Sequence, residues 1–105
     1  GKQTLEFNDL ATQLAKAHTE FMIREEAISH DYFSDRGDRL FNEEHATNVG
    51  ENVASGQRSA KDVMAAWLNS KGHRENIEGD FTHIGISAIK NNKGRYYYTQ
   101  LFLKK

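Results

Sequence analysis

The spacing of apolar residues changes along this chain, and that change limits the folds the chain can adopt. Apolar side chains recur at helical spacing in residues 8–28 and again in residues 59–69. In residues 84–88 they alternate with small or polar residues, as in a strand. A tight Asn-Asn-Lys-Gly turn (91–94) and an apolar, aromatic run (95–103) follow. We therefore expect two main helices and then an antiparallel hairpin.

Capping residues indicate where these helices begin and end. Asn8 is suited to cap the first helix, and Ser59 begins the second with Asp62 three residues later, which is a capping-box pattern. Gly72 is expected to end the second helix. His73 would then lie just past its C-terminus.

Shorter elements are expected between these segments. Glycines bracket an apolar alternation in residues 50–56 that suits a strand, and Asp38 is predicted to cap a short helical turn over residues 39–45. Trp67 lies on the apolar stripe of the second helix, so we expect it in the core. His18 lies on the flank of the first helix, where we expect it to pack and not to bind a ligand.

Composition limits the class of protein. A chain of 105 residues is large enough for one domain with its own core. The net charge is −1, with basic residues scattered among acids, so nucleic acid is not an expected partner. No apolar run approaches the roughly 20 residues that cross a bilayer. The absence of cysteine excludes disulfides and thiol chemistry.

Five short segments together resemble, in order and spacing, a known family. They are Ile28-Ser29-His30, Gly50-Glu51-Asn52-Val53-Ala54, and residues 67–77, 81–86 and 97–102. The family is the bacterial branch of the CAP superfamily, named after cysteine-rich secretory proteins, antigen 5 and pathogenesis-related proteins and also called the SCP domain. The likeness covers residues 8–103.

This resemblance implies an α+β fold in one compact domain over residues 1–105. The expected architecture is an α-β-α sandwich, with a small antiparallel sheet between helical layers. Members of this branch usually carry an extra helix before the one that starts near Asn8. Only residues 1–7 precede that point, so the extra helix is absent or lies outside this sequence.

The resemblance also implies a central cleft lined by two histidines and two glutamates, which binds a divalent metal in some relatives. His30 and His73 match the two histidines, and Glu51 matches the glutamate of the Gly-Glu-Asn motif. Ser70 holds the place of the second glutamate. The candidate catalytic residues are therefore His30, Glu51 and His73, and the candidate metal ligands are His30 and His73.

Two interpretations of these three residues remain open. Two imidazoles and a carboxylate can hold zinc or another divalent cation and leave a position for water, or Glu51 can act as general base. Ser70 supplies no charge, which would weaken cation binding. Alternatively, the cluster only joins three segments by hydrogen bonds. Catalysis is the less expected outcome, because the sequence has neither a nucleophile-elbow serine nor a zinc-protease motif.

Three functions follow from these alternatives. The leading hypothesis is a secreted or surface-displayed binding module for a ligand, a lipid, or a host or envelope component. The second is a metal-dependent, protease-like hydrolase that uses His30, Glu51 and His73. The third is a scaffold whose partner surface lies elsewhere, for instance on residues 31–48. We expect an extracellular or cell-surface location and a monomer, and a lipid anchor outside this sequence stays open.

Overall fold

The computed structural model describes residues 4–105 of the chain. Along these residues the elements are β1 (Glu6–Phe7), α1 (Asp9–Glu25), α2 (Phe33–Glu44), β2 (Asn48–Ser55), α3 (Ala60–Leu68), α4 (Lys71–Ile77), β3 (His83–Lys90) and β4 (Tyr96–Lys104). No helix in this range is long and apolar enough to cross a membrane.

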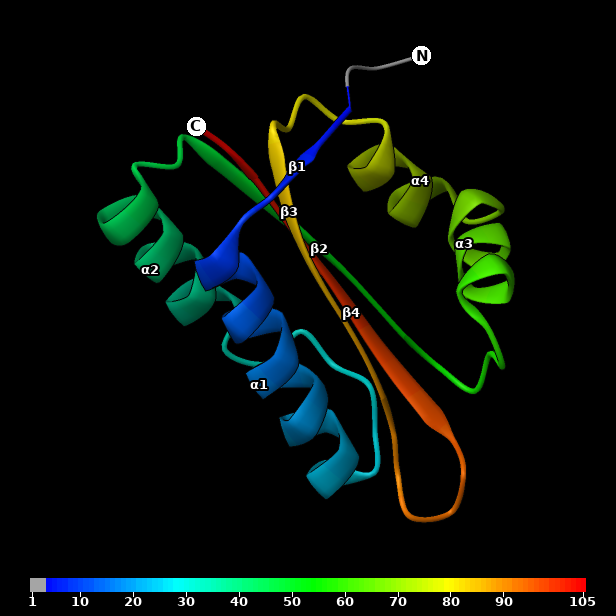
Figure 1. Ribbon diagram of the computed structural model, residues 1–105. Coiled ribbons are helices and arrows are strands. Elements are labelled where there is room, and N and C mark those ends of the chain that lie inside the picture. Colours follow the sequence, from blue (N-terminus) through cyan, green and yellow to red (C-terminus); the bar gives the residue numbers. More distant parts are fainter. Residues whose placement is uncertain (1–3) are drawn as a thin grey trace.

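The elements form three layers, with the sheet between two pairs of helices (Figure 1). On one face Ala15 of α1 and Leu40 of α2 pack against Leu101 of β4. On the other face Trp67 of α3 packs edge-on against Tyr98 of β4, with ring centroids 6.4 Å apart. The expected α-β-α sandwich is confirmed, and β4 carries core residues for both faces.

The sheet has the strand order β1-β3-β4-β2. The three long strands form two antiparallel pairs, β2–β4 and β3–β4, and the hairpin expected around residues 91–94 joins β3 to β4. β1 adds a two-residue parallel pairing with β3, opposite His83 and Ile84. The expectation about the family's extra first helix concerns in part residues 1–3, which lie outside the described residues.

Both helix starts predicted from capping residues are confirmed. The Asn8 side chain accepts a hydrogen bond from the Ala11 amide at 2.8 Å, and Ser59 Oγ accepts one from the Asp62 amide at 3.1 Å. α1 ends at Glu25, earlier than expected, because Glu26 adopts a left-handed conformation with φ of 56°. Its amide then bonds the Ile23 carbonyl, so residues 27 and 28 belong to the following loop.

The prediction of a short turn over residues 39–45 with Asp38 as its cap was wrong. α2 begins at Phe33, and Asp38 lies inside it. The residue before the helix is Tyr32, whose left-handed backbone (φ 63°) turns the chain and whose side chain gives no capping bond. Because no capping side chain marks this start, the capping rule placed it too late.

The prediction that His73 lies beyond a helix end was also wrong. α3 ends at Leu68, and a second helix, α4, begins at Lys71 and includes Gly72 and His73. The Ser70 carbonyl accepts the Arg74 amide at 2.8 Å, which starts this new helix. His73 is therefore held on a helix of its own.

Candidate functional site

Glu51 lies in the middle of β2, with its side chain only 1% exposed. Two nitrogens of Arg36 hold its carboxylate. Arg36 Nε donates to Oε2 at 2.6 Å, and Nη2 donates to Oε1 at 2.7 Å. The Arg36 side chain is itself only 8% exposed, so this is a buried bidentate ion pair between α2 and β2.

His30 completes the group around Glu51. It lies in the loop between α1 and α2, and its Nδ1 is 2.9 Å from Glu51 Oε1. Because an ionised carboxylate can only accept, Nδ1 carries the hydrogen in this contact. The His30 side chain is 54% exposed. We call Glu51, Arg36 and His30 the Glu51 network.

Arg36 was missed in the sequence analysis, although it binds the central carboxylate. Arg36 and Leu40 are four residues apart on α2 and share its buried face. The signal was therefore present, but it can be seen only when the helix is started at residue 33. With the helix started at residue 39, Arg36 fell in a loop.

His18 supports the Glu51 network from α1. It is 3% exposed, and its Nε2 is 2.7 Å from the Ser29 carbonyl, next to His30. Burial lowers the pKa of His18 below its usual 6.5, and the nearby Arg36 charge adds to this effect. A neutral His18 therefore donates to Ser29 and holds the loop that carries His30, in keeping with its expected packing role.

His73 is held separately, on α4. Its Nδ1 is 2.9 Å from Ser70 Oγ, and its carbonyl accepts from the Asn52 side chain at 3.1 Å. Asn76, one turn along α4, donates to the Glu51 carbonyl at 3.0 Å. Burial lowers the pKa of His73 below its usual 6.5, and a positive charge on His30 would lower it further.

This arrangement does not fit a three-ligand metal centre. Arg36 already holds both Glu51 oxygens, and a cation there would compete with a guanidinium. The ring of His73 bonds Ser70 through Nδ1. No cluster of three His, Cys, Asp or Glu side chains within residues 4–105 could hold a metal ion. The structure thus brings His30 and Glu51 into contact and places His73 beside them on another element.

A hollow of about 220 Å³ opens beside His73. It lies between the loop after α1, strand β2 and helix α3. Its mostly apolar lining includes Ile28, Val53, Gln57, Trp67, Ser70 and His73. Gln57 Oε1 is buried without a hydrogen-bond partner in the described chain. We call this space the His73 hollow.

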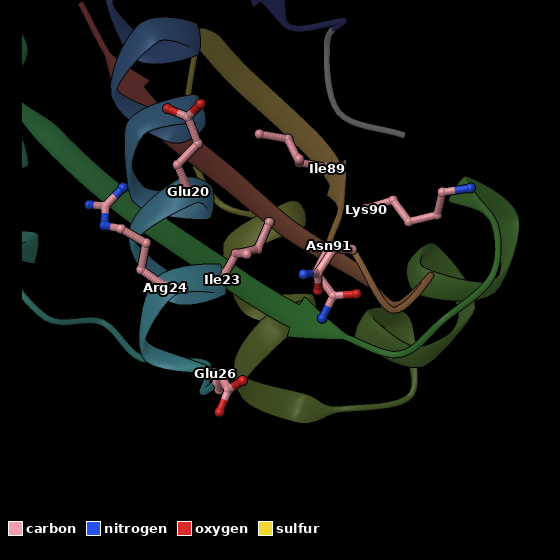
Figure 2. Close-up of a pocket in the computed structure, with 8 residues that line it drawn as sticks. Glu20, Ile23, Arg24, Glu26, Ile89, Lys90 and Asn91 are labelled. Carbon is pink, nitrogen blue, oxygen red and sulfur yellow. The ribbon is translucent and has the colours of Figure 1, made fainter.

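A larger open hollow, about 570 Å³, lies at the far end of α1 beside the β3–β4 hairpin (Figure 2). Its rim carries charges of both signs, including Glu20, Arg24, Glu26 and Lys90. These groups point in different directions, and Lys90 Nζ lies over the Tyr96 ring, 5.9 Å from its centroid. None of the three candidate residues lines this space, so we do not assign the site to it.

Comparisons with known proteins identify the family and the fold. The family model described as "CAP: Cysteine-rich secretory protein family" matches residues 1–102. Protein YkwD of Bacillus subtilis is 43% identical over 58 residues, which cover 54% of this chain and 21% of that protein. Membrane protein YlbC of the same organism is 33% identical over 110 residues, covering 100% of this chain and 30% of that protein. The chain thus spans less than a third of either relative.

Solved structures show the same fold. An outer surface protein from Borrelia burgdorferi superimposes with a TM-score of 0.86 at 26% identity, covering 98% of this chain and 79% of that one. An extracellular protein containing an SCP domain from Bacillus anthracis gives a TM-score of 0.81 at 29% identity. That match covers 98% of this chain and 34% of the other.

Proposed function

Because this chain belongs to the cysteine-rich secretory protein (CAP) family, we propose that it is a binding domain of an extracellular or surface-displayed bacterial protein. Its ligand would lie in the His73 hollow, in contact with His73. The outer surface and extracellular proteins that share its fold support this location. They do not identify a ligand.

The observation that carries the proposal is the division of polar groups between the two parts of the site. In the Glu51 network the buried charges are paired, and Arg36 also bonds the Asp31 carbonyl at 2.7 Å. In the His73 hollow, by contrast, Gln57 Oε1 is buried without a partner in the described chain. Buried polar atoms normally have partners, so the unpaired acceptor supports a ligand donor at this position.

The hydrolase alternative has no such support. Glu51 would have to give up its bonds to Arg36 before it could take a proton from water or bind a metal. His73 Nδ1 contacts the hydroxyl of Ser70, which lies within one helical turn. In a nucleophile–base pair this nitrogen would instead contact a buried acid that orients the ring. In this proposal the Glu51 network holds α2, β2 and the His30 loop together.

The proposal can be tested by nuclear magnetic resonance with a library of small, water-soluble fragments. Binding in the His73 hollow should shift the backbone signals of Val53 and the indole signal of Trp67. The Ala66→Phe variant should remove these shifts by filling the space, since Ala66 is exposed and lines it. Ala65→Phe, a neighbouring exposed position outside the lining, is the matched control.

Two results would contradict the proposal. One is a set of fragments that bind elsewhere and leave Val53 and Trp67 unaffected. The other is turnover of a substrate that disappears in the His30→Ala variant, because it would give the candidate residues a chemical role.

A further inference from the structure

A polar hollow of about 350 Å³ opens where the C-terminal end of α1 meets the hairpin of β3 and β4. Three segments line it, namely the end of α1, the end of β2 and the hairpin. Their lining residues are Glu26, Ala27, Ser55, Asn91, Lys93, Arg95 and Tyr97. It borders the hollow of Figure 2, with which it shares Glu26 and Asn91. We call this space the Tyr97 hollow.

Tyr97 brings an unused hydroxyl to this space. Only 4% of the residue is exposed, and its ring packs with Met22 of α1 and Val53 of β2. The hydroxyl lies open to the hollow and makes no hydrogen bond within residues 4–105. The next residue on β4 differs, because the Tyr98 hydroxyl donates to the Gln57 carbonyl at 2.7 Å. Since polar groups of buried side chains normally have partners, the Tyr97 hydroxyl is a donor available to a ligand.

The Tyr97 hollow has a positive wall and a negative wall. Lys93 and Arg95 supply two cations from the hairpin, and Glu26 supplies a carboxylate from the end of α1. The C-terminal end of α1 adds partial negative charge on the side of Glu26. None of these three side chains makes an ion pair in the part of the chain that the structure describes. Opposite charges therefore border one space without contacting each other.

The positive wall is held in position by the protein itself. Arg95 Nη2 donates to Ser55 Oγ at 3.2 Å, and the guanidinium packs over Gly56, where a Cβ would come within 2.8 Å of Nη2. A guanidinium has several N–H donors, so others remain for a ligand. Asn91 Oδ1 accepts from the Lys93 and Arg95 amides at 3.0 and 2.9 Å, which leaves Asn91 Nδ2 as a further donor.

We propose that the Tyr97 hollow binds a small zwitterion, namely a free α-amino acid with a polar side chain. Its carboxylate would accept from Arg95 and Lys93, and its ammonium would donate to Glu26. Its side chain would accept from the Tyr97 hydroxyl. A ligand with only negative charge fits less well, because Glu26 and the C-terminal end of α1 would repel it.

The size of the hollow agrees with such a ligand. Its volume of about 350 Å³ lies at the small end of ligand sites, which range from about 300 to 1,000 Å³. None of its three charged residues lines the His73 hollow, so the inference goes beyond the proposed function and does not depend on it.

The test is a titration of the ¹⁵N-labelled domain with L-serine, N-acetyl-L-serine and L-serinamide. At about pH 6, below the usual α-amino pKa of about 7.7–8.0, L-serine and L-serinamide both carry the ammonium. L-Serine should shift the backbone signals of Ala27, Lys93 and Arg95. Acetylation removes the ammonium and amidation removes the carboxylate, so each derivative should bind about tenfold more weakly. Equal binding of the three compounds, or no shifts at these residues, would overturn the proposal.

Two charge variants test the two walls. Glu26→Gln should remove the preference for L-serine over N-acetyl-L-serine, because the ammonium loses its partner. Arg95→Met should weaken L-serine binding about tenfold, since the carboxylate loses a charged donor. Arg58→Met is the matched control, because Arg58 is exposed and does not line the hollow, and it should leave affinity unchanged. A preference that survives Glu26→Gln, or equal losses in the two arginine variants, would refute the assignment of the walls.

Two tyrosine variants separate a role in binding from a role in folding. Tyr97→Phe removes a hydroxyl that bonds no residue in the range 4–105, so affinity for L-serine should fall about fivefold while the unfolding temperature does not fall. Tyr98→Phe removes the bond to the Gln57 carbonyl, so the unfolding temperature should fall while affinity does not. The reverse pattern would overturn the role of Tyr97.

The outcomes also separate this inference from the proposed function. L-Serine shifts confined to Val53 and Trp67 would place the amino acid in the His73 hollow, which would refute this inference and support binding there. If L-serine binds at Lys93 and Arg95 while fragments leave Val53 and Trp67 unaffected, this inference stands and the proposed function fails.

Discussion

Removing Arg36 should destabilise the domain severely, because Glu51 would keep a buried charge without its partner. The two side chains are 8% and 1% exposed, and two hydrogen bonds of 2.6 and 2.7 Å join them. Breaking a buried pair from one side costs about 3–5 kcal/mol. We expect Arg36→Met to lower the free energy of unfolding by that amount, which is a large share of the stability of a small domain.

The same helix provides a matched control. Arg39 binds Glu43 through Nε at 2.6 Å, but both side chains are about half exposed, at 53% and 50%. Exposed pairs of this kind contribute about 0.2–1 kcal/mol. Arg39→Met should therefore cost less than about 1 kcal/mol, although the residue types and the closest distance are the same.

Urea unfolding of Arg36→Met, Arg39→Met, Glu51→Met and the double variant Arg36→Met with Glu51→Met measures these differences. The double variant Arg36→Met with Glu51→Met should be more stable than Arg36→Met alone, because it leaves no buried charge uncompensated. Equal costs for Arg36→Met and Arg39→Met would refute the reasoning. A double variant less stable than either single variant would do so too, because it would make side-chain packing, and not charge, the source of the effect.

Three further predictions concern packing, protonation and metal binding. A Cβ at Gly85 would overlap the α1 backbone at Ala11. Gly85→Ala should therefore destabilise the domain by more than the roughly 1–3 kcal/mol typical of overpacking, as measured by thermal unfolding. Burial keeps the pKa of His18 below its usual 6.5, so folding stability should fall as pH is lowered from 6.5 through the folded-state pKa. Urea unfolding at a series of pH values measures this fall, and the His18→Gln variant should show a smaller one. Calorimetric titration with zinc should give the same heats for wild type and His73→Ala, and a heat lost in that variant would restore the metal-dependent hydrolase.

Most of the fold could be predicted from local signals. Asn8 and Ser59 cap their helices through their own side chains, and the alternation in residues 84–88 continues through β3, so both patterns are visible in the sequence. β1 could not be predicted in this way. It consists of two residues whose pairing with β3 depends on a partner more than 70 positions away.

The site was only partly visible in the sequence. Family likeness located His30, Glu51 and His73, but their division into two groups depends on Arg36 and Ser70. Arg36 could be recognised as buried only if α2 was started at residue 33, which places it on the same face as Leu40, and no capping residue marks that start. The His73 hollow likewise depends on how far α3 lies from the edge of β2, which is a property of the tertiary structure.

The most direct test of the account is a crystal structure of the domain grown with zinc. The account expects the Arg36–Glu51 pair to be intact, with no zinc ion shared by His30 and His73. A zinc ion bound by His30 and His73, with Glu51 released from Arg36 to join it, would contradict the account.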